Sequence, residues 1–321
     1  MTSPLIASAL ARWGLTQATC QFVAGRENQV FRVTDATGEF ALRLRRPGLR
    51  SPAELRSELE WLDAMARAGL SVPRPKPSRA GNFLEAIEGT QVDLLAWRPG
   101  RPLGTSREPL RLENPEAVFF TLGQDIARLH QASDAFAPKE GFTRLRWDIE
   151  GLLGEVPLWG RFWDNPSLAP ETRSLLVAFR QQARHDLTQL AGALDFGLTH
   201  ADLVRENVLL DGDQLHLIDF DDGGYGFRLF DIATALFKNR KEPAYEALKS
   251  ALIAGYRSKR PLDTAPLDLF LALRAVTYVG WIIPRMSEAG APERNRRFIY
   301  EARDLCAAYL AKTPDPKRTR P

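Results

Sequence analysis

Short apolar runs that alternate with polar residues dominate the first third of the chain. β-favouring runs predict strands at Cys20–Gly25, Gln29–Thr34 and Glu39–Arg45, with a turn-prone "TDATGE" between the last two. The stretch "NFLEAIEGTQVDLLAWRPG" predicts two further strands on either side of Glu88-Gly89. We therefore expect an antiparallel sheet in this part of the chain.

Helical spacing appears in "SPAELRSELEWLDAMARAGLSVPRP", which starts at Ser51. Ser51 is a good N-cap residue and Pro52 suits the first helical position, whereas Gly69 and Pro73 mark the end. Four apolar residues fall on one face of this helix: Leu55, Leu59, Leu62 and Met65. The opening "MTSPLIASALARWG" also reads as a helix, because it lacks the basic start of a signal peptide.

From about Pro102 onward the apolar pattern is mostly helical. The expected helices are 116–131, 170–192, 230–237, 243–259, 268–286 and 292–312. Two strands interrupt them, at Asn207–Leu210 and Gln214–Phe220, joined at Asp211-Gly212. The sequence therefore predicts an α+β chain with a β-rich N-terminal lobe (residues 1–97, a sheet plus one helix) and a larger helical lobe (98–321), with the hinge at "WRPGRPLG".

Composition excludes several classes of protein. Hydrophobic residues make up 44% and charged residues 26% of 321 residues, an ordinary globular mixture. The net charge of +3 gives no basic stripe, and no apolar run reaches the length of a membrane span, so neither nucleic acid nor a membrane is expected as a partner. Cys20 and Cys306 have no metal-site spacing and suit reduced thiols in a cytoplasmic protein. The oligomeric state is not indicated.

The densest cluster of chemically informative residues is "LTHADLVRENVLLDGDQLHLIDFDD", residues 198–222. It matches H-x-D-L-x-x-x-N, with a further aspartate after the next strand: His200, Asp202, Leu203, Asn207 and Asp219. In phosphoryl transfer one aspartate accepts the proton of the attacking hydroxyl, while the asparagine and the second aspartate hold Mg²⁺ against the phosphates of ATP. The alternative without a function is a surface hairpin with scattered acidic residues. The apolar runs around these residues disfavour it.

A kinase also needs a cation on the triphosphate, and the first lysine in the chain is only Lys76. Arg43 in "FALRL" stands where a third-strand lysine would be and keeps a permanent charge. Its expected partner is Glu58 on the following helix, because Glu60 points about 200° away. The alternative is that Arg43 is one of many arginines on an exposed strand face.

Other nucleotide contacts are less sharply indicated. The loop "GRENQV" has one glycine and Asn28, which we expect to bend the chain or donate to a phosphate, although a plain hairpin turn is nearly as well supported. Adenine is expected on the backbone of Ala96 to Arg98, between apolar side chains such as Val30 and Leu209.

The acceptor site is expected between the catalytic loop and the C-terminal helices. An aromatic cage for a choline-like cation is one interpretation of Trp147, Trp159, Trp163, Tyr278 and Trp281, although tryptophans in amphipathic helices more often belong to the core. Asp222 could bind an amino group, and Arg274 or Arg285 a carboxylate, which together would suit a hydroxy amino acid.

The segments "LTHADLVRENVLL", "LIDFDDGGYGFRLFDIATAL", "LGQDIARLH" and "FALRLRRPGLRSPAELRSELEWLDAMARAGLSVPRP" together resemble the aminoglycoside phosphotransferase superfamily. That superfamily includes choline, homoserine and hydroxylysine kinases and stress response kinase A, and the likeness is greatest to its bacterial homoserine-kinase-type-II-like and stress-response-kinase-like branch. The resemblance implies a bilobal protein-kinase-like fold and phosphorylation of hydroxyl groups with ATP and Mg²⁺.

The resemblance also implies roles for individual residues. Asp202 would be the catalytic base, Asn207 and Asp219 would ligate Mg²⁺, and Arg43 would stand at the lysine position with Glu58 as its partner. His200 would brace the catalytic loop rather than react, and Asp231 would accept backbone hydrogen bonds that lock the same loop.

The chain departs from the protein-kinase pattern at two places. Asp221 replaces the glycine of D-F-G, and only 11 residues separate Asp219 from Asp231, with no A-P-E segment. A protein-kinase activation loop does not fit there, which favours a small metabolite of the amino acid or amino alcohol type as acceptor. Two alternatives stay open: a protein Ser/Thr kinase of the stress-response type, and a nucleotide-binding pseudokinase regulator, as Arg43 would allow. Intact Asp202, Asn207 and Asp219 argue against the second.

Overall fold

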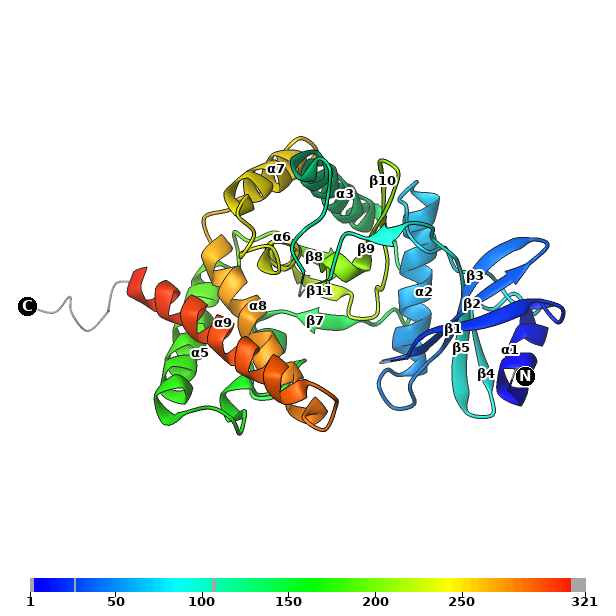
Figure 1. The fold of residues 1–321 in the computed structure, drawn as a ribbon, viewed down its shortest axis with the longest axis horizontal. Helices are drawn as coiled ribbons and strands as arrows, with labels where there is room; N and C mark the ends of the chain where they lie inside the picture. Colours follow the sequence, from blue (N-terminus) through cyan, green and yellow to red (C-terminus); the bar gives the residue numbers. More distant parts are fainter. Residues whose placement is uncertain (1–2, 26, 106–107, 313–321) are drawn as a thin grey trace, which may run out of the picture. The chain divides into compact units, whose positions relative to one another are not determined.

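The computed structural model describes residues 3–25, 27–105 and 108–312, which form two compact units (Figure 1). The first unit comprises the described residues of 1–108, 131–144 and 205–223. The second comprises those of 109–130, 145–204 and 224–321. The catalytic-loop sequence that begins at His200 therefore starts in the second unit and ends in the first.

A five-stranded antiparallel sheet forms the frame of the first unit, in the order β1-β2-β3-β5-β4. Its strands are Thr19–Gly25 (β1), Gln29–Asp35 (β2), Gly38–Leu44 (β3), Leu84–Ile87 (β4) and Thr90–Ala96 (β5). All five predicted strands are confirmed. Helix α1 (Pro4–Trp13) packs its apolar face on this sheet, with Ile6, Ala9 and Leu10 in the same core as Val33 and Leu42.

Helix α2 (Pro52–Arg67) begins as the sequence predicts. The Ser51 side chain accepts from the Glu54 N–H while the Glu54 carboxylate accepts from the Ser51 N–H, a capping box that satisfies two otherwise unpaired donors. The predicted apolar face is buried: Leu55, Leu59, Leu62 and Met65. Because Glu58 lies on the same helix, this burial fixes its position against the sheet.

A second, small sheet in the first unit contains the middle of the acid-rich segment 198–222, in the order β10-β9-β6. Its strands are Arg101–Pro102 (β6), Val208–Asp211 (β9) and Gln214–Leu217 (β10), and the predicted hairpin at Asp211-Gly212 is confirmed. Strand β10 ends at Leu217 rather than at the predicted Phe220, because Asp219 has a φ of 65°, which extended backbone cannot adopt.

Helices dominate the second unit. They are α4 (Ile149–Leu153), α5 (Pro170–Leu190), α6 (Leu229–Phe237), α7 (Tyr245–Arg257), α8 (Leu267–Trp281) and α9 (Ala291–Lys312), with most of α3 (Pro115–Ala135). The helix predicted to reach residue 286 ends at Trp281, because Pro284 in the next turn has no N–H to donate. Within the described ranges, no helix has the length and apolar character needed to cross a membrane.

A three-stranded sheet in the second unit, in the order β7-β11-β8, was not predicted. Its strands are Leu145–Trp147 (β7), Phe196–Thr199 (β8) and Gly224–Phe227 (β11). Strand β8 ends directly before His200, so this sheet fixes the start of the catalytic-loop sequence. The α+β fold, with a sheet-rich N-terminal part and a helical C-terminal part, is confirmed.

Candidate active site

Asp231 on α6 fixes the backbone at the start of the loop. Its two carboxylate oxygens accept hydrogen bonds from the His200 N–H (2.9 Å) and the Ala201 N–H (2.7 Å). Ala201 has a φ of 64°, a conformation that a non-glycine residue keeps only where the surroundings enforce it. The predicted role of Asp231 as the acceptor of these backbone bonds is therefore confirmed.

His130 holds Asp231 from the other side. Its Nε2 lies 3.0 Å from Asp231 Oδ2 and its Nδ1 lies 2.9 Å from the Tyr256 hydroxyl. Burial opposes ionisation of Asp231, but the interactions with His130 and His200 together outweigh it and keep the pKa of the carboxyl below its ordinary value. Burial also lowers the pKa of His130. A carboxylate only accepts, so a neutral His130 donates from Nε2 and accepts from Tyr256 at Nδ1.

Asp202 is held by an arginine that the sequence did not link to it. Arg274 on α8 places Nη2 at 2.5 Å from Asp202 Oδ1 and 2.8 Å from the Tyr278 hydroxyl, while Nη1 donates to the Ala201 carbonyl (3.3 Å). Burial opposes the charge of Arg274, but Tyr278 and Asp202 raise its pKa. The Arg274 side chain is fully buried, whereas 21% of the Asp202 side chain is exposed. Asp202 is thus an oriented, partly accessible carboxylate.

The aromatic residues near Arg274 surround the protein's own guanidinium. Arg274 Cζ lies 4.7 Å from the ring centroid of Trp159 and 4.4 Å from that of Tyr278. The ring centroids of Trp159 and Trp281 are 6.3 Å apart. Both terminal nitrogens of Arg274 have protein partners and its side chain is fully buried, which disfavours Arg274 as the group that binds an acceptor carboxylate. Binding of that carboxylate by the alternative residue, Arg285, stays a prediction. Two of the other candidate cage residues are buried in the core: Trp147 and Trp163.

Arg43 and Glu58, the pair expected on phosphate-binding grounds, are in contact in the first unit. Arg43 Nη1 donates to Glu58 Oε1 (2.9 Å), and Nε donates to Asp93 Oδ1 (2.7 Å). Glu60 instead accepts from the main chain of Lys139, which supports the choice of Glu58. Arg43 is only 7% exposed, so the alternative of an arginine on an exposed strand face is wrong.

One nitrogen of Arg43 fits a phosphate oxygen. Nη2 is buried and has no hydrogen-bond partner among the described residues. Burial opposes ionisation of Glu58, but Arg45, Arg43 and Arg144 outweigh it and hold its pKa far below its ordinary value. The cation therefore faces a permanent carboxylate on one side and keeps one unused donor, which suits the anionic oxygens of a nucleotide.

Asn207 and Asp219 lie on neighbouring segments of the first unit. The Ile218 N–H donates to the Asn207 carbonyl (3.0 Å), which joins the two segments directly before Asp219. An amide and a carboxylate supply the oxygen ligands that Mg²⁺ prefers. No group of three or more His, Cys, Asp or Glu residues that could hold a metal occurs in the described ranges. The two donors fit Mg²⁺, an ion that proteins usually bind through only one or two side chains together with phosphate oxygens and water.

The remaining predicted nucleotide contacts are placed as follows. Asn28 Oδ1 accepts from the Arg46 N–H (3.2 Å), which ties the loop after β1 to the end of β3. The Ala96 N–H donates to the Arg74 carbonyl (2.8 Å), and the Arg98 guanidinium donates to a main-chain carbonyl. Nucleotide binding by these three residues stays a prediction.

Comparison with known proteins places this geometry among phosphotransferases. Residues 19–265 match the pattern of the phosphotransferase enzyme family. The chain is 26% identical to the amicoumacin kinase of Bacillus subtilis over 295 residues. This alignment covers 86% of this chain and 83% of that protein. It is 29% identical to the homoserine kinase of Rhizobium johnstonii over 242 residues. This alignment covers 71% of this chain and 67% of that protein.

A solved structure of a microcompartment-associated aminopropanol kinase has a similar fold. It superposes with a TM-score of 0.83 at 28% identity and covers 95% of this chain and 97% of that chain. The match extends over both the sheet-rich and the helical part. The resemblance inferred from the sequence motifs is confirmed.

Proposed function

Since the chain belongs to the phosphotransferase enzyme family and is a kinase, we propose that it uses ATP and Mg²⁺ to phosphorylate a hydroxyl group of an amino alcohol or a hydroxy amino acid. The observation that carries this proposal is the carboxylate of Asp202, held by the buried Arg274 and partly exposed. A positioned carboxylate is the group that phosphoryl transfer to an alcohol requires as a base.

Asp202 accepts the proton of the acceptor hydroxyl as the oxygen attacks the γ-phosphate. Arg274 is a positioning residue: its contacts with Asp202 Oδ1, the Ala201 carbonyl and Tyr278 fix the orientation of the carboxylate. Asp231 accepts from the backbone of the same loop, and His200 Nδ1 accepts from the Asp202 N–H (3.3 Å).

The nucleotide phosphates are bound by the N-terminal lobe (residues 1–97) in this proposal, and the acceptor by the helical lobe (98–321). Arg43 Nη2 donates to a phosphate oxygen, and Glu58 orients Arg43. Asn207 and Asp219 hold Mg²⁺, which neutralises charge on the phosphates when it is bound. Asn28 and the backbone from Ala96 to Arg98 contribute the remaining nucleotide contacts.

Two observations support the choice of acceptor. The relatives include kinases named for homoserine and aminopropanol, both small molecules with an amino and a hydroxyl group. Arg274 already occupies the faces of Trp159 and Tyr278, which disfavours a choline-like cation at those rings. Asp222 pairs with Arg50 through Oδ1 (2.8 Å) and 24% of its side chain is exposed, so binding of the acceptor's amino group by Asp222 stays a prediction.

A panel of acceptors tests the proposal. ADP release above the background ATPase rate would be measured with amino alcohols, hydroxy amino acids, choline and aminoglycosides, each with Mg²⁺ and ATP. We expect stimulation by a member of the first two groups and none by choline. Transfer only to protein substrates would favour the protein-kinase alternative, and absence of any turnover would favour the pseudokinase alternative.

A further inference from the structure

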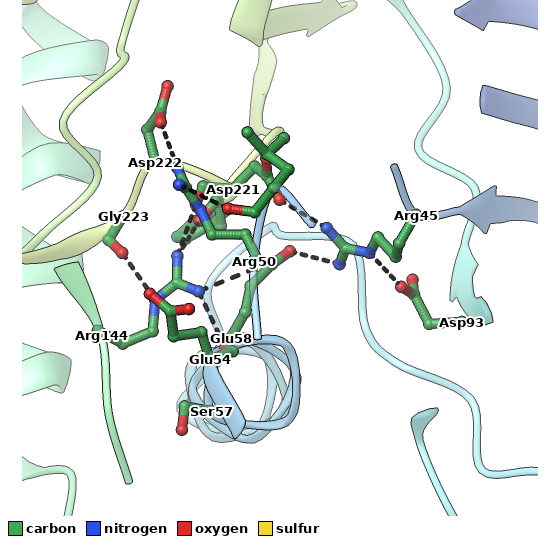
Figure 2. A network of polar contacts seen from close by, with 12 residues as sticks. Arg45, Arg50, Glu54, Ser57, Glu58, Asp93, Arg144, Asp221, Asp222 and Gly223 are labelled. Carbon is green, nitrogen blue, oxygen red and sulfur yellow. Dashed lines mark hydrogen bonds and ion pairs between the residues drawn. The ribbon is translucent and has the colours of Figure 1, made fainter. Parts of the chain in front are cut away.

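The segment from Asp219 to Gly223, here called the metal segment, is held through its backbone by Arg144 (Figure 2). Arg144 Nη2 donates to the carbonyls of Phe220 (2.9 Å) and Asp221 (2.8 Å), and Nε donates to the carbonyl of Gly223 (2.7 Å). Its remaining nitrogen, Nη1, donates to the Glu54 carbonyl on α2 (3.0 Å). One guanidinium thus connects three of the four residues that follow Asp219 to the helix that carries Glu58.

Arg45 holds the metal segment through a side chain. Its Nη1 lies 2.6 Å from Asp221 Oδ1, at the position where the protein-kinase pattern has glycine. Its other nitrogens contact Glu58 Oε1 (3.0 Å) and Asp93 Oδ2 (2.6 Å), which are the same two carboxylates that bind Arg43. An unbroken chain of ion pairs therefore runs from the proposed phosphate-binding arginine to the residue two positions after Asp219.

The charges in this buried network balance. Arg43, Arg45 and Arg144 face three carboxylates, and all six side chains are at least nine-tenths buried: the carboxylates are Glu58, Asp93 and Asp221. Burial opposes the charge of Arg45, but Asp93, Glu58 and Asp221 raise its pKa well above the ordinary value. Buried ion pairs contribute little net stability over apolar packing, so a role in fixing one arrangement explains such a network better than stability does.

Aromatic packing holds the metal segment on another side. The ring of the fully buried Phe220 lies edge-on to Trp61 with centroids 5.1 Å apart, and Trp61 Nε1 donates to Ser133 Oγ (3.0 Å). A Cβ at Gly223 would lie 2.6 Å from the Trp61 ring, so the close approach requires glycine. Asp219, with its φ of 65°, is thus kept in an unfavourable conformation by a well-packed environment.

We infer that Arg144 and Arg45 are positioning residues for Mg²⁺. Arg144 fixes the backbone that follows Asp219, and Arg45 connects Asp221 to the carboxylates shared with Arg43. The positions of the metal-binding Asp219 and the phosphate-binding Arg43 relative to each other are therefore fixed within the first unit. This inference rests on the proposed function. It predicts that the affinity for Mg²⁺ depends on two arginines that act only through other residues.

Calorimetric titration of Mg²⁺ into protein saturated with the non-hydrolysable analogue AMP-PNP tests the inference. Arg144→Lys keeps the charge but cannot reach three carbonyls, and Arg45→Lys cannot bridge three carboxylates. We expect Mg²⁺ affinity to fall about 10- to 100-fold in each variant, as is typical when the partners of metal ligands are changed. Binding of AMP-PNP without metal should change little, because Arg43 is retained.

The matched control is Arg180→Lys in the second unit. Arg180 Nε also donates to a main-chain carbonyl, that of Leu153 (2.8 Å), and Nη2 pairs with Glu155, but none of its contacts involves the metal segment. This variant should bind Mg²⁺ as the wild type does. Asp221→Asn gives a second test that keeps the side-chain volume, should a lysine variant fail to fold, and we expect it to weaken Mg²⁺ in the same direction.

Two outcomes would overturn the inference, and they can be told apart. Unchanged Mg²⁺ affinity in the folded variants, with only a lowered melting temperature, would mean that the arginines stabilise the fold and do not position the metal. Failure of the wild type to bind Mg²⁺ in the presence of AMP-PNP would contradict the proposed function, and this inference with it.

Discussion

Replacement of Arg43 by alanine should remove most of the affinity for ATP while the fold persists. In the variant, Glu58 and Asp93 both keep Arg45 as a partner, at 3.0 and 2.6 Å, so neither buried carboxylate is left without a cation. The unused Nη2 of Arg43 is lost, and with it the donor that we assign to a phosphate oxygen. The network also gains one uncompensated negative charge, which repels the triphosphate.

The size of the effect follows from the burial of the charge pair that we assign to Arg43 and a phosphate oxygen of ATP. Truncation of one partner of a buried, hydrogen-bonded charge pair costs about 2–5 kcal/mol. At 1.4 kcal/mol for each factor of ten, this corresponds to roughly 30- to 4,000-fold weaker binding of ATP. Arg43→Lys keeps the charge but concentrates three separate donors on one nitrogen, so it should retain measurable turnover with a raised requirement for ATP.

The assay compares the ATP dependence of turnover and the melting temperature for wild type, Arg43→Ala and Arg43→Lys. Arg32→Ala is the matched control, because Arg32 lies on the adjacent strand β2 and forms a partly exposed ion pair with Glu39. The control should leave ATP affinity unchanged. Wild-type affinity in Arg43→Ala would refute the phosphate-binding role. No turnover in the wild type, with activity restored by Arg43→Lys, would support the pseudokinase alternative.

Three further predictions concern Asp202, Asp219 and His130. Asp202→Asn should lower turnover about 10²- to 10⁴-fold with nucleotide affinity nearly unchanged, because the base contacts the acceptor and not ATP; wild-type turnover would remove Asp202 from the mechanism. Asp219→Ala should lose the Mg²⁺-dependent thermal stabilisation by ATP, and full stabilisation would place the metal elsewhere. Burial holds the pKa of His130 in the folded protein below its ordinary value of 6.5. As the pH falls, the unfolded chain therefore takes up a proton at a higher pH than the folded protein does, and the free energy of unfolding should fall below about pH 6.5. His130→Asn should flatten this slope relative to wild type, and an equal slope in denaturant titrations would refute the assignment.

The local part of the site could be predicted from the sequence because its spacing is short. The motif from His200 to Asn207 lies on one loop, and the Arg43–Glu58 pair follows from a strand and the helix after it, 15 residues apart. Asp231 could be predicted from the family resemblance, and its hydrogen bonds to the loop confirm it.

The rest of the site depends on contacts between distant residues, which no local pattern encodes. Arg45 and Asp221 are 176 residues apart, and Arg274 and Asp202 are 72 apart. Arg45 looked like any other arginine in a chain with 43 basic residues, and Arg274 was considered only as a contact for the acceptor. Burial distinguishes them, and burial is a property of the packed fold.

The fold shows the same division between local and distant signals. Long amphipathic helices and the five strands of the first sheet were predicted, because their periodicity extends over many residues. Strands β7, β8 and β11 have only three or four residues each, and β11 is "GYGF", whose glycines are poor strand formers. They form because partners from elsewhere in the chain pair with them.

Phosphorus-31 NMR of one reaction mixture tests the central claim most directly. Wild-type protein would be incubated with Mg²⁺, ATP and each amino alcohol or hydroxy amino acid of the panel, in parallel with Asp202→Asn. The account predicts that one acceptor yields a phosphomonoester resonance in an amount equal to the ADP formed, and that the variant yields neither. Release of inorganic phosphate alone, or a phosphomonoester formed as fast by Asp202→Asn, would contradict it.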